Sequence, residues 1–323
     1  EIHKFNSKSE KKLSKEELEI RRKELEELER ELNKERMENE KKAAEEAEKI
    51  WDNSETAEPD HPYLKKKGIN PYNIRSSEGD LIIPVCDFNG YLTSVQRIDQ
   101  NGNKKFLTGG RITGSYYRIG KIKDNAPICI AEWFATAATI REATGFPVVI
   151  AFTSGNLKPV AKIFREKYPK HKIIICGDDD WKKPKNIGKK KAKEAAQVIN
   201  GYLAIPEFGN DRPEKATDFN DMAKLYGLKA VKDCILNNCQ EVQDCFWTEP
   251  KDGLKIDYTG LYDLIKSFGI KYLITDDKGL GSILVQIKDN VVQEINIAMI
   301  LSLITDYVNR LPENSFEKYT KKD

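Results

Sequence analysis

The segment Ile173–Asp180 reads IIICGDDD and is the clearest indication of the fold in this chain. Four apolar residues are followed by one glycine and three aspartates, which is typical of a buried strand that ends in a polar loop. A second apolar run, Ile128–Ala131, ends in the same way at an acid, Glu132. Because an α/β sheet gathers its ligands at the carboxyl ends of its strands, we expect an acidic centre at this edge.

Strand and helix patterns alternate on both sides of this stretch, over residues 126–206. Apolar runs predict strands at 128–131, 148–151, 173–176 and 203–205, and helical periodicity predicts helices at 134–143, 157–167 and 189–199. Strands separated by helices of about ten residues are typical of a parallel sheet with right-handed crossovers and helices on both faces. The predicted class is therefore α/β.

The N-terminal segment has a different composition. Residues 8–50 are dominated by Lys, Glu, Arg, Leu and Ala and contain neither Gly nor Pro, which predicts one long helix. Leu18, Leu25 and Leu32 are spaced by seven, but over so few heptads that two interpretations stay open. The helix is either a solvated arm or a surface for dimerisation or partner binding. Residues 52–62 are interpreted as a linker.

Residues 63–123 predict a small antiparallel β unit with turns at Asn89-Gly90 and Asn101-Gly102. Residues 59–123 contain seven Lys and four Arg against five acids, a net charge of +6. From residue 246 onward, helix and strand patterns predict a small α+β module. The predicted domains are 1–58 (helical arm and linker), 59–123 (basic β unit), 124–232 (catalytic domain) and 246–323 (α+β module).

Composition excludes several classes of protein. The chain is 39% hydrophobic and 33% charged, and its net charge of +2 says little about partners. None of the six cysteines forms a CxxC pair, so no zinc site is expected, and reduced thiols in a cytoplasmic protein are predicted. No apolar run approaches the ~18 residues of a membrane span, so no membrane partner is expected. Because the chain begins without Met and has charged ends, we expect it to be part of a longer protein.

The acidic residues point to a metal site. Three carboxylates gathered at one sheet edge repel one another unless cations lie between them, and hard oxygen ligands select Mg²⁺ or Mn²⁺. Asp178 and Asp180 are expected on one side, with Asp179 pointing away. A further acidic motif, Asp218-Phe219-Asn220-Asp221, lies downstream. The alternative is an acidic loop that caps a helix N-terminus.

Seven lysines follow the aspartates within fifteen residues: Lys182, Lys183, Lys185, Lys189, Lys190, Lys191 and Lys193. Beside an acidic metal site they would attract a polyanion. A solvated helix face is the alternative for Lys190, Lys191 and Lys193.

Taken in order, these segments resemble the Toprim primases of phages and conjugative plasmids and, more distantly, the bacterial replicative primase. The resemblance runs from His61 to about Val231, roughly half of the chain, and its strength lies in the order of motifs that are individually weak. The matching segments are His61–Leu64 with Lys67–Ile69, Ile83–Val85 with Gly90, Ser94–Arg97, Lys104–Leu107, Gly109-Gly110, Gly114-Ser115, Ile130–Glu132 with Ala135–Ala137, Asp178-x-Asp180 with Gly188 and Ala192, and Asp218–Asp221.

The resemblance implies template-directed primer synthesis on single-stranded DNA from nucleoside triphosphates, with Mg²⁺ or Mn²⁺. Glu132 would be a metal ligand and general base at the primer hydroxyl, and Asp178 and Asp180 would be metal ligands, with Asp218 and Asp221 as further candidates. The residues expected to contact template or nucleotide phosphates are Arg97, Lys104, Lys105, Arg111, Lys189 and Lys190.

One position departs from the family pattern: Trp133 follows the glutamate where the family usually has glycine. It keeps open a second class of function, a non-catalytic nucleic-acid-binding scaffold. A Toprim nuclease or strand-cleaving enzyme is the other alternative, and the β unit before Glu132 favours a primase over it. The C-terminal module resembles the region before a phage-type helicase domain, which implies a primase–helicase fusion, although the chain contains no GxxxxGK[ST] motif.

Overall fold

The computed structural model describes residues 15–242, 247–248, 255–256, 258–274, 282–288 and 291–309. The described backbone divides into two compact units. The first contains the described residues up to 119 and residues 150–152, and the second contains residues 120–149 and the described residues from 153 onward.

The first unit is built on an antiparallel sheet, as predicted. The strands lie in the order β1-β2-β3-β4-β5. They are β1 (Glu55–Thr56), β2 (Arg75–Ser77), β3 (Asp80–Cys86), β4 (Leu92–Ile98) and β5 (Lys104–Phe106), with β6 (Tyr117–Ile119) and the short helix α2 (Pro62–Lys67) beside them. Both predicted turns have their glycine at positive φ, +88° at Gly90 and +97° at Gly102, where a side chain would be strained.

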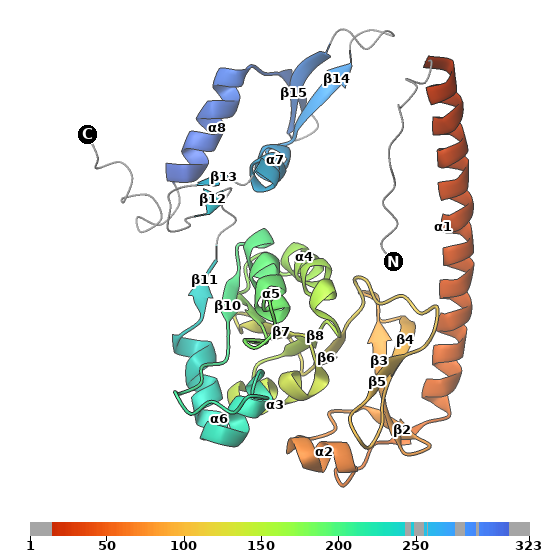
Figure 1. Ribbon diagram of the computed structural model, residues 1–323, viewed down its shortest axis with the longest axis vertical. Helices are drawn as coiled ribbons and strands as arrows, with labels where there is room; N and C mark the ends of the chain where they lie inside the picture. Colours follow the sequence, from red (N-terminus) through yellow and green to blue (C-terminus); the bar gives the residue numbers. More distant parts are fainter. Residues whose placement is uncertain are drawn as a thin grey trace, which may run out of the picture. The chain divides into compact units, whose positions relative to one another are not determined.

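The long helix α1 (Lys15–Asp52) packs its C-terminal part on this sheet (Figure 1). Ala47 is buried in one cluster with Ile82 of β3 and Val95 of β4, and its small side chain lets the helix come close to the strands. Residues 19–39 of the same helix are exposed, including Leu25 and Leu32. Whether this part is a solvated arm or a partner surface stays a prediction.

The second unit contains the predicted parallel sheet. Within this unit, the strands of the sheet lie in the order β11-β10-β9-β7-β8. They are β7 (Ile128–Ala131), β8 (Val148–Ile150), β9 (Ile173–Cys176), β10 (Tyr202–Ala204) and β11 (Gln240–Glu241). β7 and β10 both run parallel to β9, and β11 is an antiparallel edge strand. Every side chain of β7, β8 and β9 is buried.

Helices cover both faces of this sheet, which confirms the predicted α/β class. They are α3 (Phe134–Thr144), α4 (Leu157–Lys167), α5 (Ile187–Val198) and α6 (Phe219–Asn237), with the 3₁₀ turn η1 (Ser154–Asn156) before α4. Figure 1 shows α4 and α5 together on one face and α3 and α6 on the other. The pattern did not predict α6, which is kinked at Gly227 (φ +82°).

The C-terminal residues form the predicted α+β module. Its elements are β12 (Trp247–Thr248), β13 (Lys255–Ile256), α7 (Tyr258–Ser267), β14 (Ile270–Ile274), β15 (Ser282–Lys288), β16 (Val291–Glu294) and α8 (Ile297–Asn309). β14, β15 and β16 form an antiparallel sheet. Within the ranges described above, no helix combines the length and the apolar character needed to cross a membrane.

Close packing at the end of β9 predicts a large effect of one added methyl group. A Cβ built at Gly177 would lie 2.4 Å from the Cβ of Ala192 in α5 and 2.9 Å from the Cδ1 of Ile205. We expect Gly177→Ala to lower the free energy of unfolding by about 1–3 kcal/mol, because Ala192 is fully buried and cannot make room unless α5 shifts. Urea denaturation measures this. Gly155→Ala is the matched control, since a Cβ there meets nothing within 4 Å, and an equal effect of the two would contradict the prediction.

Candidate active site

Glu132 and Asp178 follow the ends of two neighbouring parallel strands. Ala131 at the end of β7 is paired in register with Cys176 at the end of β9. Glu132 is the next residue after β7, and Asp178 lies two residues after β9. Asp178 is only 9% exposed, and Glu132 is half-buried. The two carboxylates therefore belong to the same edge of the sheet, as the sequence predicted.

The start of α5 lies against this edge. A Cβ built at Gly188 would lie 3.3 Å from the Cβ of Asp178 and 3.3 Å from the Oδ2 of Asp180. Asp178 and Asp180 thus both lie beside Gly188 in the first turn of α5. The absence of a side chain at position 188 lets the helix approach them. The N-terminus of a helix carries a partial positive charge, which favours carboxylates beside it.

The donors suit a hard divalent cation in chemical type, since all are carboxylate oxygens. The three carboxylates are not arranged as a preformed metal site. The Nζ of Lys183 lies 3.1 Å from the Oδ1 of Asp180, and among the residues that the structure describes no three His, Cys, Asp or Glu side chains form a group that could hold a metal ion. Glu132, Asp178 and Asp180 as ligands, and Mg²⁺ or Mn²⁺ as cofactor, stay predictions.

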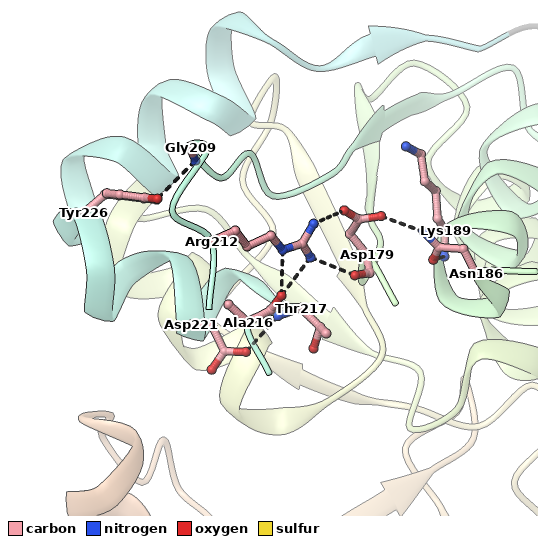
Figure 2. Close-up of polar contacts among 9 residues, drawn as sticks. All are labelled: Asp179, Asn186, Lys189, Gly209, Arg212, Ala216, Thr217, Asp221 and Tyr226. Atoms are coloured by element: carbon pink, nitrogen blue, oxygen red, sulfur yellow. Dashed lines mark hydrogen bonds and ion pairs between the residues drawn. The ribbon is translucent and has the colours of Figure 1, made fainter. Parts of the chain in front are cut away.

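Asp179, between the two candidate ligands, is held by a different set of contacts (Figure 2). Its Oδ2 accepts a hydrogen bond of 2.6 Å from Arg212, and its Oδ1 accepts one of 2.6 Å from the side-chain amide of Asn186. The side chains of Asp179 and Arg212 are each 14% exposed. Burial by itself would raise the pKa of the Asp179 carboxyl, but the hydrogen bonds from Arg212 and Asn186, with the charges of Arg212 and Lys189, outweigh it and hold that pKa below its ordinary value.

This lowered pKa predicts an acid-sensitive contribution to stability. A carboxyl whose pKa is lower in the folded state stabilises the fold above its ordinary pKa of about 4, and the contribution is lost as pH falls through the folded-state value. Asp179→Asn should therefore flatten the fall in the free energy of unfolding below pH about 4. Urea denaturation across an acid pH series tests this, and parallel pH profiles of wild type and variant would refute it.

Asp218 and Asp221 have a local structural role at the start of α6. The side chain of Asp218 accepts a hydrogen bond of 2.8 Å from the backbone N–H of Asp221, and Asp221 accepts one of 3.0 Å from the N–H of Thr217. Paired acceptors of this kind are typical of a helix N-cap. Metal binding by Asp218 and Asp221 stays a prediction.

In the first unit, the predicted phosphate-binding residues do not all share one face. Arg97 of β4 lies opposite Lys105 of β5 in the register, so these two project to the same side, whereas Lys104 projects to the other. Acids already accompany the arginines: Arg97 lies 3.7 Å from Glu78 and 3.8 Å from Asp80, and Arg111 lies 3.9 Å from Glu40 and 3.5 Å from Asp87.

In the second unit, Lys189 and Lys190 are exposed in the first turn of α5, and the Nζ of Lys190 lies 4.0 Å from Glu194. The binding role of these lysines and of the first-unit residues stays a prediction. Trp133 is the N-cap of α3 with an extended backbone, φ −116° and ψ 154°, a conformation open to any residue. Tryptophan in place of the family glycine therefore creates no backbone strain beside Glu132.

Sequence reasoning missed Arg212 and Asn186. Arg212 lies in the loop between β10 and α6, where no periodicity marks it, and 33 positions separate it from Asp179. Asn186 adopts the left-handed conformation at the N-cap of α5, for which asparagine is well suited. The only signal for Asn186 was its place before a lysine-rich helical segment.

Part of the chain is similar to a known family of domains and to several known proteins. Residues 126–205 match the family model of the Toprim domain. A stretch of 157 residues is 36% identical to the DNA primase TraC of Escherichia coli and covers 46% of this chain but 15% of that protein. The predicted resemblance to the Toprim primases is thus confirmed, and the chain spans only a small part of the curated relative.

Two solved structures are also similar. The primase fragment of the bacteriophage T7 primase-helicase protein is 21% identical, with a TM-score of 0.41, over 53% of this chain and 73% of that one. The Aquifex aeolicus primase (zinc-binding and RNA polymerase domains) is 14% identical, with a TM-score of 0.43, over 72% of this chain and 64% of that one.

Proposed function

We propose that this chain is the catalytic core of a DNA primase, which joins nucleoside triphosphates into a short primer on a single-stranded DNA template. The observation that carries the proposal is the position of Glu132 and Asp178 after the paired ends of β7 and β9, in the part of the chain that matches the Toprim domain. The identity to a protein named DNA primase supports it. We place this activity in the cytoplasm, with a helicase domain in the same polypeptide as a candidate partner.

Each acidic residue has a separate part in this proposal. Asp178 and Asp180, which border the start of α5, would hold a divalent cation together with Glu132. A cation bound there would neutralise phosphate charge and favour attack of the primer 3′-hydroxyl on the α-phosphorus of the nucleotide, from which pyrophosphate leaves. Glu132, half-buried at the sheet edge, would accept the proton of the primer 3′-hydroxyl. Asp180 would have to exchange its lysine partner, Lys183, for the cation.

The basic residues would bind the polyanions. Lys189 and Lys190 lie in the first turn of α5, the helix whose start borders Asp178 and Asp180, and would draw nucleotide phosphates toward that edge. Arg97 and Lys105 share one face of the β unit and would contact the template backbone. Such contacts release counterions, so template binding should weaken as salt rises.

Primer synthesis on single-stranded DNA, with NTPs and Mg²⁺ or Mn²⁺, tests the proposal. We expect the wild type to make product and Glu132→Ala and Asp178→Ala to make none above background. Equal product from all three proteins would exclude this acidic centre. Nicking of the template without synthesis would favour a Toprim nuclease, and DNA binding with neither reaction would favour a scaffold.

A further inference from the structure

The loop that carries Asp178 and Asp180 is attached to the segment before α6 through Arg212. Besides its bond to the Asp179 carboxylate, the guanidinium donates a hydrogen bond of 2.8 Å to the backbone carbonyl of Asp179. It also donates to the carbonyl of Ala216 from two nitrogens, at 2.9 and 2.7 Å. The backbone N–H of Asp179 in turn donates to the carbonyl of Thr217 at 2.8 Å. Figure 2 shows Arg212 between the two segments.

Aromatic rings hold the arginine in place. The guanidinium carbon lies 4.2 Å from the ring centre of Phe208 and 5.0 Å from that of Trp181. A planar guanidinium held between aromatic rings keeps its N–H donors in a fixed orientation. The ammonium group of a lysine, on a flexible side chain, would not keep such an orientation.

On the other side, Asn186 connects the same loop to α5. Its side-chain amide donates to Asp179 at 2.6 Å, and its side-chain oxygen accepts from the N–H of Lys189 at 3.4 Å, capping the helix. The two carboxylate oxygens of Asp179 therefore bind two different parts of the domain. Its backbone N–H and carbonyl bind the protein as well.

From these contacts we infer that Asp179 and Arg212 are positioning residues, which fix the backbone between Asp178 and Asp180 so that these two neighbours can bind one divalent cation together. The inference rests on the proposed function. Asp179 itself directs both of its oxygens to protein donors, at 2.6 Å each, on the side of Arg212 and Asn186. Contacts that orient metal ligands in this way typically change metal affinity by about 10–100-fold when they are removed.

Binding of Mn²⁺ alone, followed by electron paramagnetic resonance on the whole chain well below its unfolding temperature, tests the inference. We expect Asp179→Asn to weaken Mn²⁺ binding by about 10–100-fold, with circular dichroism unchanged. Asp211→Asn is the matched control, because Asp211 is an exposed aspartate next to Arg212 and should bind as the wild type does. In the synthesis assay, Asp179→Asn should raise the Mg²⁺ concentration needed for half-maximal rate, and the rate at saturating Mg²⁺ should approach that of the wild type.

The outcomes separate this inference from the proposed function. If Asp178→Asn abolishes Mn²⁺ binding while Asp179→Asn leaves it unchanged, the positioning role is overturned and the metal site stands. If the wild type binds no Mn²⁺, the metal site is overturned and the inference falls with it. If Asp179→Asn does not fold, Arg212→Lys replaces it, since a lysine keeps the charge but loses the planar set of N–H donors, and the same loss of affinity is expected. Wild-type affinity in Arg212→Lys would then overturn the inference.

Discussion

Under the proposed function, Glu132→Gln is expected to reduce the rate of primer synthesis by on the order of 10²–10⁴-fold, the usual contribution of a general base. The substitution preserves the size of the side chain and replaces a charged oxygen by an amide. Glu132 is the first residue after β7, so the strand and its pairing with β9 should be unaffected. Initial rates at saturating NTP and Mg²⁺, with the thermal unfolding temperature measured in parallel, check both parts of this expectation.

Glu166→Gln provides the control for this variant. Glu166 is exposed on α4 in the same unit, and the substitution makes the same chemical change away from the acidic edge. It should retain the wild-type rate. A Glu132→Gln protein that synthesises primer at the wild-type rate would contradict the assignment of Glu132, and a comparable loss in Glu166→Gln would show that the assay responds to surface charge.

The sequence predicted the parts of the site that lie on regular elements. β7, β9 and α4 have the predicted bounds, because buried strands and an amphipathic helix leave strong hydrophobic patterns. Glu132 and Asp178 could be placed at one edge because parallel strands bring their carboxyl ends together. β16 was missed because its four residues are all exposed, so that Val291–Glu294 shows no alternation.

The parts that depend on contacts between loops could not be predicted. Asp179 was expected to point away from its neighbours, but nothing in the local pattern identified Arg212 as its partner. The conformation of a loop is decided by the elements that it joins, and here Arg212 is oriented by Phe208 and by the carbonyl of Ala216. In the same way, Lys104 and Lys105 were both expected to contact phosphates, but successive side chains of the strand β5 project to opposite faces of the sheet.

Arg212→Met is expected to lower the free energy of unfolding by about 1.5–3 kcal/mol, the usual contribution of hydrogen bonds to a charged group, because the Arg212–Asp179 pair is half-buried. The substitution leaves the carboxylate of Asp179, 14% exposed, without its cation. It also removes the donors to the carbonyls of Asp179 and Ala216. Urea denaturation measures the change. Lys182→Met is the control, because the Lys182–Glu214 pair is exposed and should contribute at most about 1 kcal/mol.

The double variant Asp179→Asn/Arg212→Met shows where that free energy comes from. If most of the cost of Arg212→Met comes from the half-buried carboxylate of Asp179 that has lost its cation, then neutralising Asp179 in the same protein should recover part of it. The double variant should then lose less than the sum of the two single variants. Additive losses would mean instead that Arg212 acts mainly through its hydrogen bonds to backbone carbonyls. A loss in Arg212→Met no larger than in Lys182→Met would mean that the half-buried pair stabilises the fold no more than an exposed one, and would leave the loop of Asp178 and Asp180 without the anchor proposed for it.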